Sequence, residues 1–292
     1  MLIVEVLVGA LTLGGVYALI AMGLTLQYGV ARIMNLAHGE VMVASAFIVY
    51  ALFSAGVINP LLAFALALPL GFGFQWGLYK LLLAPLVRRA ASPAALEVDS
   101  ILATFGLLFI IEGLVLVAFG GGHYSYAFLG QAVQIGGTAV AANRLLAAGF
   151  AVVVCVAVYA VLTFTRWGTA MRALANAPRF AHLVGIDPKA MAALAFALGG
   201  ALVVAAGVLV SMFVPFSASQ GVVFTMKALI IVILGGVGNI MGCLAAAVLL
   251  GFVETLVARF IDPGLTLAAT FLIFLLVLLF RPRGLFGGRA VR

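Results

Sequence analysis

Charged residues are scarce in this 292-residue chain. They make up 8% of the sequence, against roughly 25% in soluble domains, while hydrophobic residues reach 66% and the mean hydropathy is +1.35. The core of a soluble protein cannot hide that much apolar surface. The composition therefore excludes an ordinary soluble protein and predicts a protein embedded in a membrane.

Residues that carry enzymatic or metal chemistry are also few. The chain has three histidines, and His38 has no cysteine, aspartate or second histidine at ligand spacing, so no metal site is predicted. No nucleophile and base arrangement suggests an enzyme. The two cysteines, Cys155 and Cys243, each lie in an apolar run, where buried free thiols are expected.

Long apolar runs dominate instead. An α-helix needs roughly 20 residues to cross a hydrocarbon core about 30 Å thick. The predicted spans are 60–82, 99–119, 144–165, 189–213 and 265–280, an N-terminal helix before residue 30, and two short helices within 221–260. The expected fold is a single all-α transmembrane domain over 1–292, a polytopic bundle of about eight membrane helices with interrupted or re-entrant segments.

Basic residues set the expected orientation. Eleven of the fifteen lie in three segments: Lys80, Arg88 and Arg89; Arg166, Arg172, Arg179 and Lys189; and Arg281, Arg283, Arg289 and Arg292. Basic loops stay in the cytoplasm, so these segments, including the 281–292 tail, are predicted there, and the glycine-rich loop 120–143 outside. The basic excess is thus an orientation signal, and no nucleic-acid partner is expected. The N-terminus then lies outside, unless a break within the membrane at 30–40 undoes the count.

A polar cluster, VARIMNLAHGEVMVAS (30–45), interrupts the apolar runs. Asn35 is predicted to cap a helix through Val41 to Tyr50, with His38 nearby and Glu40 in its opening turns, close to the positive helix end. Three roles remain open for this cluster. It starts and packs a helix, lines a gate or pathway, or recognises substrate directly.

Other polar residues at membrane depth are functional candidates because burying a charge there is costly. Glu112, Lys227 and Glu254 belong to this group, and Lys227 either snorkels outward or pairs with Glu40 or Glu112. Gly235, Gly236 and Gly238, in the interrupted stretch LGGVGNIMGC (234–243), are further pathway candidates. The GxxxG spacings 73–77 and 238–242 predict close helix packing.

The connection at 166–188 carries an unusual density of helix signals. Met171 and Leu174 share one face of a short helix while Arg172 lies on another, and Pro178 breaks it. Asn176 or Ala177 can cap a second piece that ends at Gly185, and Asp187 with Pro188 can start the next span. This pattern favours two short helices that form a docking surface over a merely solvated loop.

The order GGVYALIAMGLTLQYGVARIMNLAHGE, RWGTAMRALANAPRFAHLVGID, KALIIVILGGVGNIMGCLAAAVLLG and a terminal RPRGLFG resembles the LivH-type permease subunits of bacterial branched-chain amino-acid ABC importers, over essentially the whole chain. The resemblance implies a LivM-type second permease, two ATPase subunits and an external, periplasmic substrate-binding protein as partners, with membrane lipid around them. The matching ATPase-coupling stretch is Gly168 to Pro188. The residues expected to couple are Arg166, Gly168, Met171, Arg172, Ala173, Leu174, Asn176, Leu183 and Gly185.

The expected function is therefore a multi-pass permease of the bacterial inner membrane that imports branched-chain or related hydrophobic amino acids by alternating access. The chain has no GxxxxGK[ST] phosphate loop, so no cofactor is expected in it, and ATP and Mg belong to the partner ATPases. Similar permeases carry other amino acids, urea or short amides. A self-sufficient secondary transporter or channel is the alternative from another class.

Overall fold

The structure, a computed structural model, describes residues 2–135, 137–281 and 284–286. It consists almost entirely of helices, with one two-stranded antiparallel sheet in the described part. The elements are α1 (Leu2–Ala31), α2 (His38–Ser54), α3 (Pro60–Leu78), the π-helical turn η1 (Tyr79–Leu83), α4 (Ala84–Arg89), α5 (Pro93–Phe119), β1 (Ala132–Ile135), β2 (Thr138–Ala141), α6 (Ala142–Phe164), α7 (Arg166–Asn176), the 3₁₀ turn η2 (Pro178–Val184), α8 (Pro188–Ser211), η3 (Ala218–Gln220), α9 (Gly221–Gly235), α10 (Ile240–Phe260), η4 (Pro263–Leu265) and α11 (Thr266–Phe280).

Eight helices among the described residues are long and apolar enough to cross a membrane, and α2 is a shorter apolar helix. The predicted polytopic helical bundle is therefore confirmed. Two predicted spans are too short: the one predicted to begin at 99 begins at Pro93, and the one predicted to end near 82 continues through η1 and α4 to Arg89.

Local caps explain where several helices begin. Asn59 accepts a hydrogen bond from the Leu61 N–H before α3, and Ser92 accepts one from Ala95 before α5. Each cap precedes a proline in the first helical turn, where the missing N–H has no intrahelical partner to lose. The β1–β2 hairpin in the 120–143 loop was not predicted, because short strands with many glycines around them carry little alternation.

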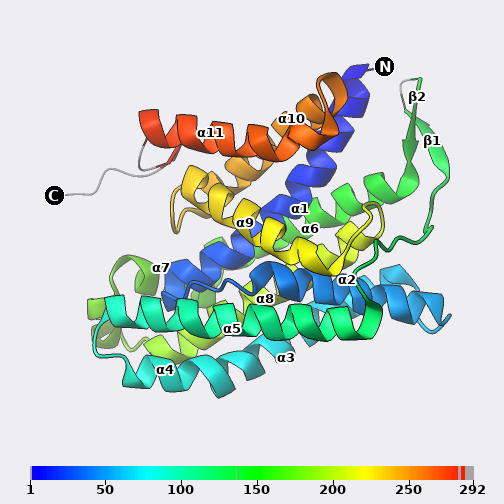
Figure 1. Cartoon of the computed structure of the whole chain (residues 1–292). Coiled ribbons are helices and arrows are strands. Elements are labelled where there is room, and N and C mark those ends of the chain that lie inside the picture. The colour runs from blue at the N-terminus through cyan, green and yellow to red at the C-terminus, as the bar shows by residue number, and fades with distance from the viewer. Residues whose placement is uncertain (1, 136, 282–283, 287–292) are drawn as a thin grey trace.

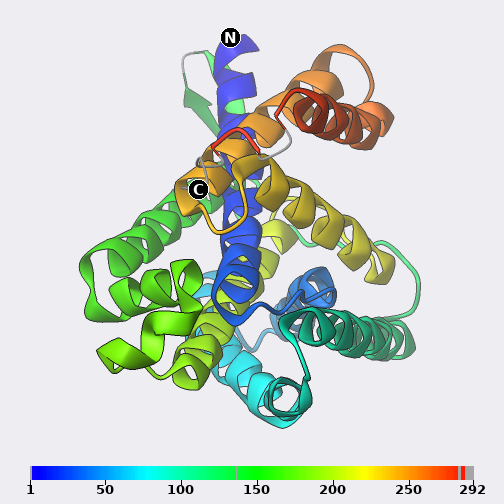
Figure 2. The same cartoon turned by 90° about the vertical axis from the view of Figure 1, so that its left-hand side faces the viewer.

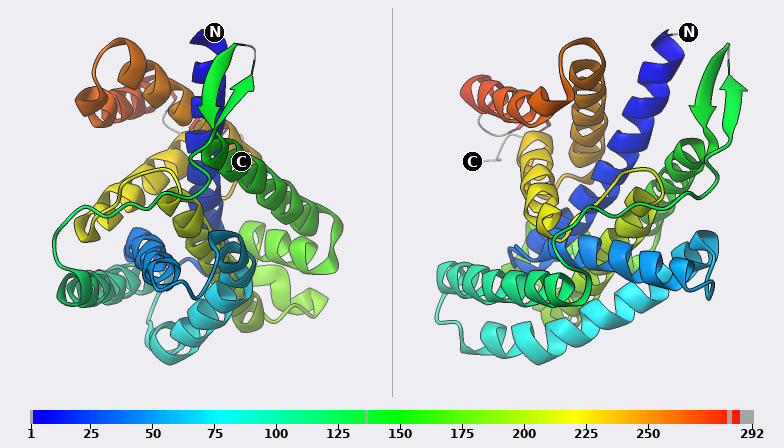
Figure 3. Two further views of the ribbon diagram at one scale, coloured as in Figure 1. Left: turned by 90° about the vertical axis from the view of Figure 1, so that its right-hand side faces the viewer. Right: turned by 45° about the vertical axis from the view of Figure 1, so that its right-hand side comes forward.

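Helices α1 and α8 form the centre of the bundle. In the most apolar 18-residue stretch of each span, 83% of the α8 stretch and 72% of the α1 stretch is buried, against 17% for α5 and 6% for α11. Figures 1, 2 and 3 show α1 passing obliquely through the molecule, with α11 on the outside. The outer helices present apolar surface to lipid, whereas α1 and α8 contact other helices.

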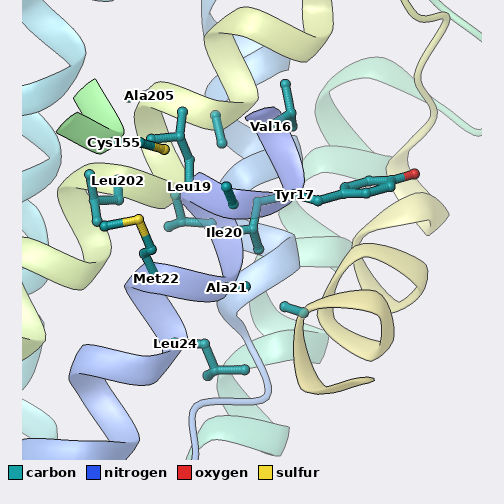
Figure 4. Packing of buried hydrophobic residues seen from close by; sticks show 14 of the residues in the cluster. Val16, Tyr17, Leu19, Ile20, Ala21, Met22, Leu24, Cys155, Leu202 and Ala205 are labelled. Carbon is teal, nitrogen blue, oxygen red and sulfur yellow. The ribbon is translucent and has the colours of Figure 1, made fainter. Parts of the chain in front are cut away.

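Small side chains allow the central helices to approach closely. Leu19 and Met22 of α1 lie beside Leu202 and Ala205 of α8 (Figure 4), and Gly23 faces Gly199 so closely that a Cβ on either would collide with the other's backbone. Glycines at such contacts let helices pack in a membrane.

The predicted packing role of the GxxxG spacings is wrong for one of them. A Cβ on Gly73 or Gly77 meets open space, and of the other pair only Gly242 packs, against Gly235. GxxxG spacing places two glycines on one helix face, but it does not determine whether that face meets another helix.

The described residues of the three basic segments lie at one end of the bundle. The ends of α4 and α11 and the α7 to η2 region lie on the left of Figure 1, while the N-terminus and the β1–β2 hairpin lie on the right. This agrees with the predicted separation of the basic connections from the 120–143 loop. Of the predicted tail, residues 282–283 and 287–292, with Arg283, Arg289 and Arg292, lie outside the described residues.

Candidate functional site

The helical conformation is interrupted after α1, at residues 32–37, which form the α1–α2 break. Arg32 adopts the left-handed conformation (φ 56°), and residues 33–37 run back into the bundle before α2 begins at His38. Nε2 of His38 lies 3.1 Å from the carbonyl oxygen of Ile20. Ile20 precedes the end of α1 by eleven residues, which at 1.5 Å per residue is about 17 Å. The α2 helix therefore starts deep inside the bundle, as a broken helix would.

Asn35 holds this break in place from a fully buried position. Its amide nitrogen donates to Oε1 of Gln27 (3.1 Å), and Gln27 in turn donates to the carbonyl of Phe196 in α8 (3.1 Å). The predicted helix cap is wrong in its position: the residue before α2 is Ala37, and Asn35, two residues upstream, accepts the Ala37 N–H (3.1 Å).

Two threonines from other helices hold the same segment. Oγ1 of Thr104 in α5 accepts the Leu36 N–H (3.1 Å), and Thr225 in α9 donates to the Leu36 carbonyl (3.2 Å). Thr225 also accepts the Gly39 N–H (2.8 Å), one of the free donors at the start of α2. Nothing in the sequence marked these threonines, because a lone Thr in an apolar helix is common.

Glu40 lies where two helices begin. It sits in the first turn of α2, is 1% exposed, and its carboxyl packs against Gly221 at the start of α9 and accepts the Val222 N–H. Both helix N-termini favour negative charge there. Oε1 of Glu40 has no partner among the described residues, and Glu112 of α5 is near enough to interact with it electrostatically.

Lys227 belongs to a separate polar cluster. Its ammonium lies 2.9 Å from Oε2 of Glu254 and donates to the Tyr17 hydroxyl (2.7 Å), and Tyr17 donates to Glu254 (2.6 Å). Thr270 donates to the other Glu254 oxygen (2.7 Å). The predicted pairing of Lys227 with Glu40 or Glu112, and the outward snorkelling, are both wrong: its side chain is 11% exposed and contacts Tyr17 of α1 and Glu254 of α10. Thr270 adds α11 to the cluster through Glu254.

The three pathway glycines lie outside the α1–α2 break, although Gly238 lies beside Gly29 in the last turn of α1. Gly235, Gly236 (φ 94°) and Gly238 (φ 82°) form the turn between α9 and α10, at the end of the bundle that carries α7. The stretch after α11 packs on this turn: Leu285 N–H donates to the Leu234 carbonyl (2.7 Å). Interrupted apolar sequence here reflects a turn between antiparallel spans.

The α7–η2 segment (Arg166–Val184) has the predicted construction. Met171 and Leu174 are buried, and Gly168 packs against the Leu162 carbonyl, where a side chain would collide. Ala177 caps η2 and Gly185 ends it at φ 73°. Of the other expected coupling residues, Ala173 is half-buried, and the remaining four are exposed: Arg166, Arg172, Asn176 and Leu183.

The outer face of this segment is apolar and unpartnered in the described chain. Phe180 is 64% exposed, Leu183 80% and Val184 71%, yet they lie beyond the apolar spans, at the end of the bundle with the basic segments. Exposed apolar patches mark sites of interaction with a protein, a membrane or a ligand.

Arg32 connects the break to this segment. Its guanidinium donates to the carbonyl of Ala175 (3.5 Å), in the last turn of α7, where carbonyls lack helical partners and cations are favoured. The α7–η2 segment and the α1–α2 break are thus in direct contact through Arg32.

Comparison with known proteins supplies the family. The model of the family described as "Branched-chain amino acid transport system / permease component" matches residues 6–280. The high-affinity branched-chain amino acid transport system permease proteins LivH of Escherichia coli (strain K12) and BraD of Pseudomonas aeruginosa are similar. LivH is 28% identical, over 94% of this chain and 92% of its own length, and BraD 29%, over 96% and 94%. A probable LivH of Methanocaldococcus jannaschii is 27% identical over 88% of this chain and 81% of its own length. No solved structure matches. The chain belongs to the family of branched-chain amino acid transport system permease components.

Proposed function

We propose that this chain is a permease subunit of an ATP-driven importer that moves branched-chain amino acids into the cytoplasm. One structural observation carries the proposal: the exposed apolar face of α7–η2 packs on the bundle through Met171 and Leu174, and Arg32 connects α7 to the helix break inside the bundle. The substrate class rests on the printed names of the relatives LivH and BraD.

The mechanism proposed is alternating access. An ATPase subunit binds Phe180, Leu183 and Val184 and moves α7. Arg32, which is bonded to α7, transmits this motion to the α1–α2 break. Thr104 and Thr225 connect the break to α5 and α9, so these helices shift relative to α2. Small shifts of packed helices are a common way to open one side of a pathway while closing the other.

The proposed partners follow from what this chain lacks. Its sequence has no phosphate-binding loop, so two ATPase subunits would bind ATP and Mg. A LivM-type second permease would complete the pathway, and a periplasmic binding protein would deliver substrate to the end with the β1–β2 hairpin. This orientation places the basic segments and the C-terminus in the cytoplasm of a bacterial inner membrane.

The test is uptake by liposomes that contain this chain, a second permease and the ATPases, with binding protein and ATP supplied. We expect leucine uptake only when ATP and both ATPase subunits are present. Leucine uptake by this chain without ATPases would establish the alternative, a secondary transporter or channel. Uptake that urea or a short amide blocks better than leucine would keep the mechanism and change the substrate.

A further inference from the structure

A cavity of about 510 Å³ lies apart from the pathway and the α7–η2 face. Its lining residues come from the α3–η1–α4 arm, from the start of α8 and from α7. This end of the bundle, with the basic segments, faces the viewer in Figure 2. The lining includes three basic side chains, Lys80, Arg88 and Lys189, one acidic side chain, Asp187, and three aromatic ones, Trp76, Tyr79 and Trp167.

The depth of this cavity matches the edge of the hydrocarbon core. Lys80 follows Pro60 by twenty residues, which corresponds to about 30 Å of helix, one hydrocarbon thickness. At this level the helix changes to a π-helical turn, Tyr79–Leu83, which widens the backbone. Such turns occur frequently at functional sites. The cavity therefore lies at the level of lipid headgroups.

The basic side chains of the cavity outnumber its one carboxylate and are not paired with it. Lys80, Arg88 and Lys189 form no ion pair within the described residues, where both ion pairs lie elsewhere. The Asp187 carboxylate is engaged at the start of α8, where it accepts the Lys189 N–H (2.9 Å). With one acidic and three basic groups, the lining has an excess of positive charge that favours the binding of an anion.

The aromatic lining favours a lipid as the source of that anion. The Lys80 ammonium lies 3.6 Å from the centre of the Trp76 ring, which orients both groups at the cavity wall. Tryptophan is typical of the membrane interface, where its ring meets acyl chains and its N–H meets headgroups. Exposed apolar side chains of the same arm, Phe74 and Leu81, extend the surface into the lipid.

We propose that this cavity binds the phosphate headgroup of an anionic phospholipid, with Lys80, Arg88 and Lys189 on the phosphate and Trp76 against the acyl chains. Basic pockets between membrane helices on the cytoplasmic side hold such headgroups. The bound lipid would bridge the α3–η1–α4 arm to α8 and to Trp167 of α7. The inference is independent of the transported substrate, and it stands if the proposed function fails.

Tryptophan fluorescence tests this site directly, because Trp76 and Trp167 are the only tryptophans in the chain. The full chain is reconstituted in mixed vesicles in which either phosphatidylglycerol or phosphatidylcholine carries brominated acyl chains that quench nearby tryptophan. We expect the quenching curves to give a preference for phosphatidylglycerol of at least about tenfold. Each basic lining residue changed to glutamine should lower it about fivefold, the factor for about 1 kcal/mol per charge.

Matched variants test whether the basic residues of the lining bind the lipid. Lys80→Gln and Arg88→Gln should each lower the preference, whereas Arg89→Gln, the loss of the same charge outside the lining, should not. The single variants keep the test valid if a triple variant with Lys189→Gln fails to fold.

Equal quenching by the two lipids, or a preference that survives Lys80→Gln with Arg88→Gln, would overturn the proposal. So would inorganic phosphate in phosphatidylcholine vesicles that changes the fluorescence as strongly as the anionic lipid does, since free phosphate would then be the ligand.

Discussion

The ammonium of Lys227 in α9 and the carboxylate of Glu254 in α10 lie 2.9 Å apart inside the bundle. Every oxygen of Glu254 has a partner, because Tyr17 and Thr270 donate to it from α1 and α11. A charge pair at this depth is tolerated when its geometry and remaining hydrogen bonds are satisfied. The cluster therefore ties the outer helix α11 to the central helix α1.

Removal of one member should destabilise the protein strongly. Lys227→Met leaves Glu254 buried without its cation, and such a change typically costs about 3–5 kcal/mol. Thermal unfolding of the purified protein in detergent measures it, and the double variant Lys227→Met with Glu254→Gln should recover part of the loss. Arg259→Gln is the control, because its pair with Glu5 is exposed. A double variant less stable than Lys227→Met would contradict this role.

Gly221→Ala should impair transport of every substrate. A methyl group at this position collides with the Glu40 carboxyl, where α2 and α9 meet. Overpacking typically costs about 1–3 kcal/mol, so we expect uptake by the reconstituted importer to fall by about tenfold or more. Gly77→Ala is the matched control, since its added methyl group meets open space. Equal effects of the two variants would argue against a tight α2–α9 contact.

Asn35→Ala and Glu40→Ala should lower uptake without changing substrate preference. Both side chains hold the α1–α2 break through contacts with the protein itself, Asn35 with Gln27 and Glu40 with Val222. Uptake of leucine in competition with a panel of other amino acids measures the preference. A variant that transports well but prefers a different amino acid would show direct substrate recognition instead.

Changes in the α7–η2 segment should uncouple hydrolysis from uptake. Arg172→Glu replaces the donor to the Thr163 carbonyl (3.1 Å), and Gly185→Val forces a branched residue into φ 73°. We expect stimulation of ATP hydrolysis by loaded binding protein to fall severalfold in each. Gly149→Ala, in α6 with open space around it, should keep normal coupling. Normal stimulation in Arg172→Glu and Gly185→Val would refute the docking assignment.

The variant Arg32→Gly should impair the coupling of α7 to the α1–α2 break without destabilising the fold. Glycine adopts φ 56° without strain, so the variant should fold at least as stably as the wild type. It removes the guanidinium that reaches the Ala175 carbonyl, so uptake per ATP hydrolysed should fall. The ratio of leucine uptake to phosphate release measures this effect. An unchanged ratio would mean that motion reaches the break by another route.

Much of the fold could be predicted because its signals are local. The lengths of the apolar runs identified the spans, and the basic residues separated the two ends of the bundle. Ala177 and Gly185 flank η2, and Asp187 caps α8, as predicted. Each of these signals acts within one helical turn or through composition alone.

Contacts between helices could not be predicted in the same way. A helix that is apolar on all sides has no stripe to show which face is buried, so nothing in the sequence paired Lys227 with Glu254 or left Gly73 and Gly77 in open space. The sequence alone determined that the protein is a membrane helix bundle, and it located the connection at 166–188 with its helix start and stop signals. The rotation and depth of each helix, set by packing against its neighbours, decided that Glu40 meets Gly221, that Arg32 reaches α7 and that basic side chains surround a cavity.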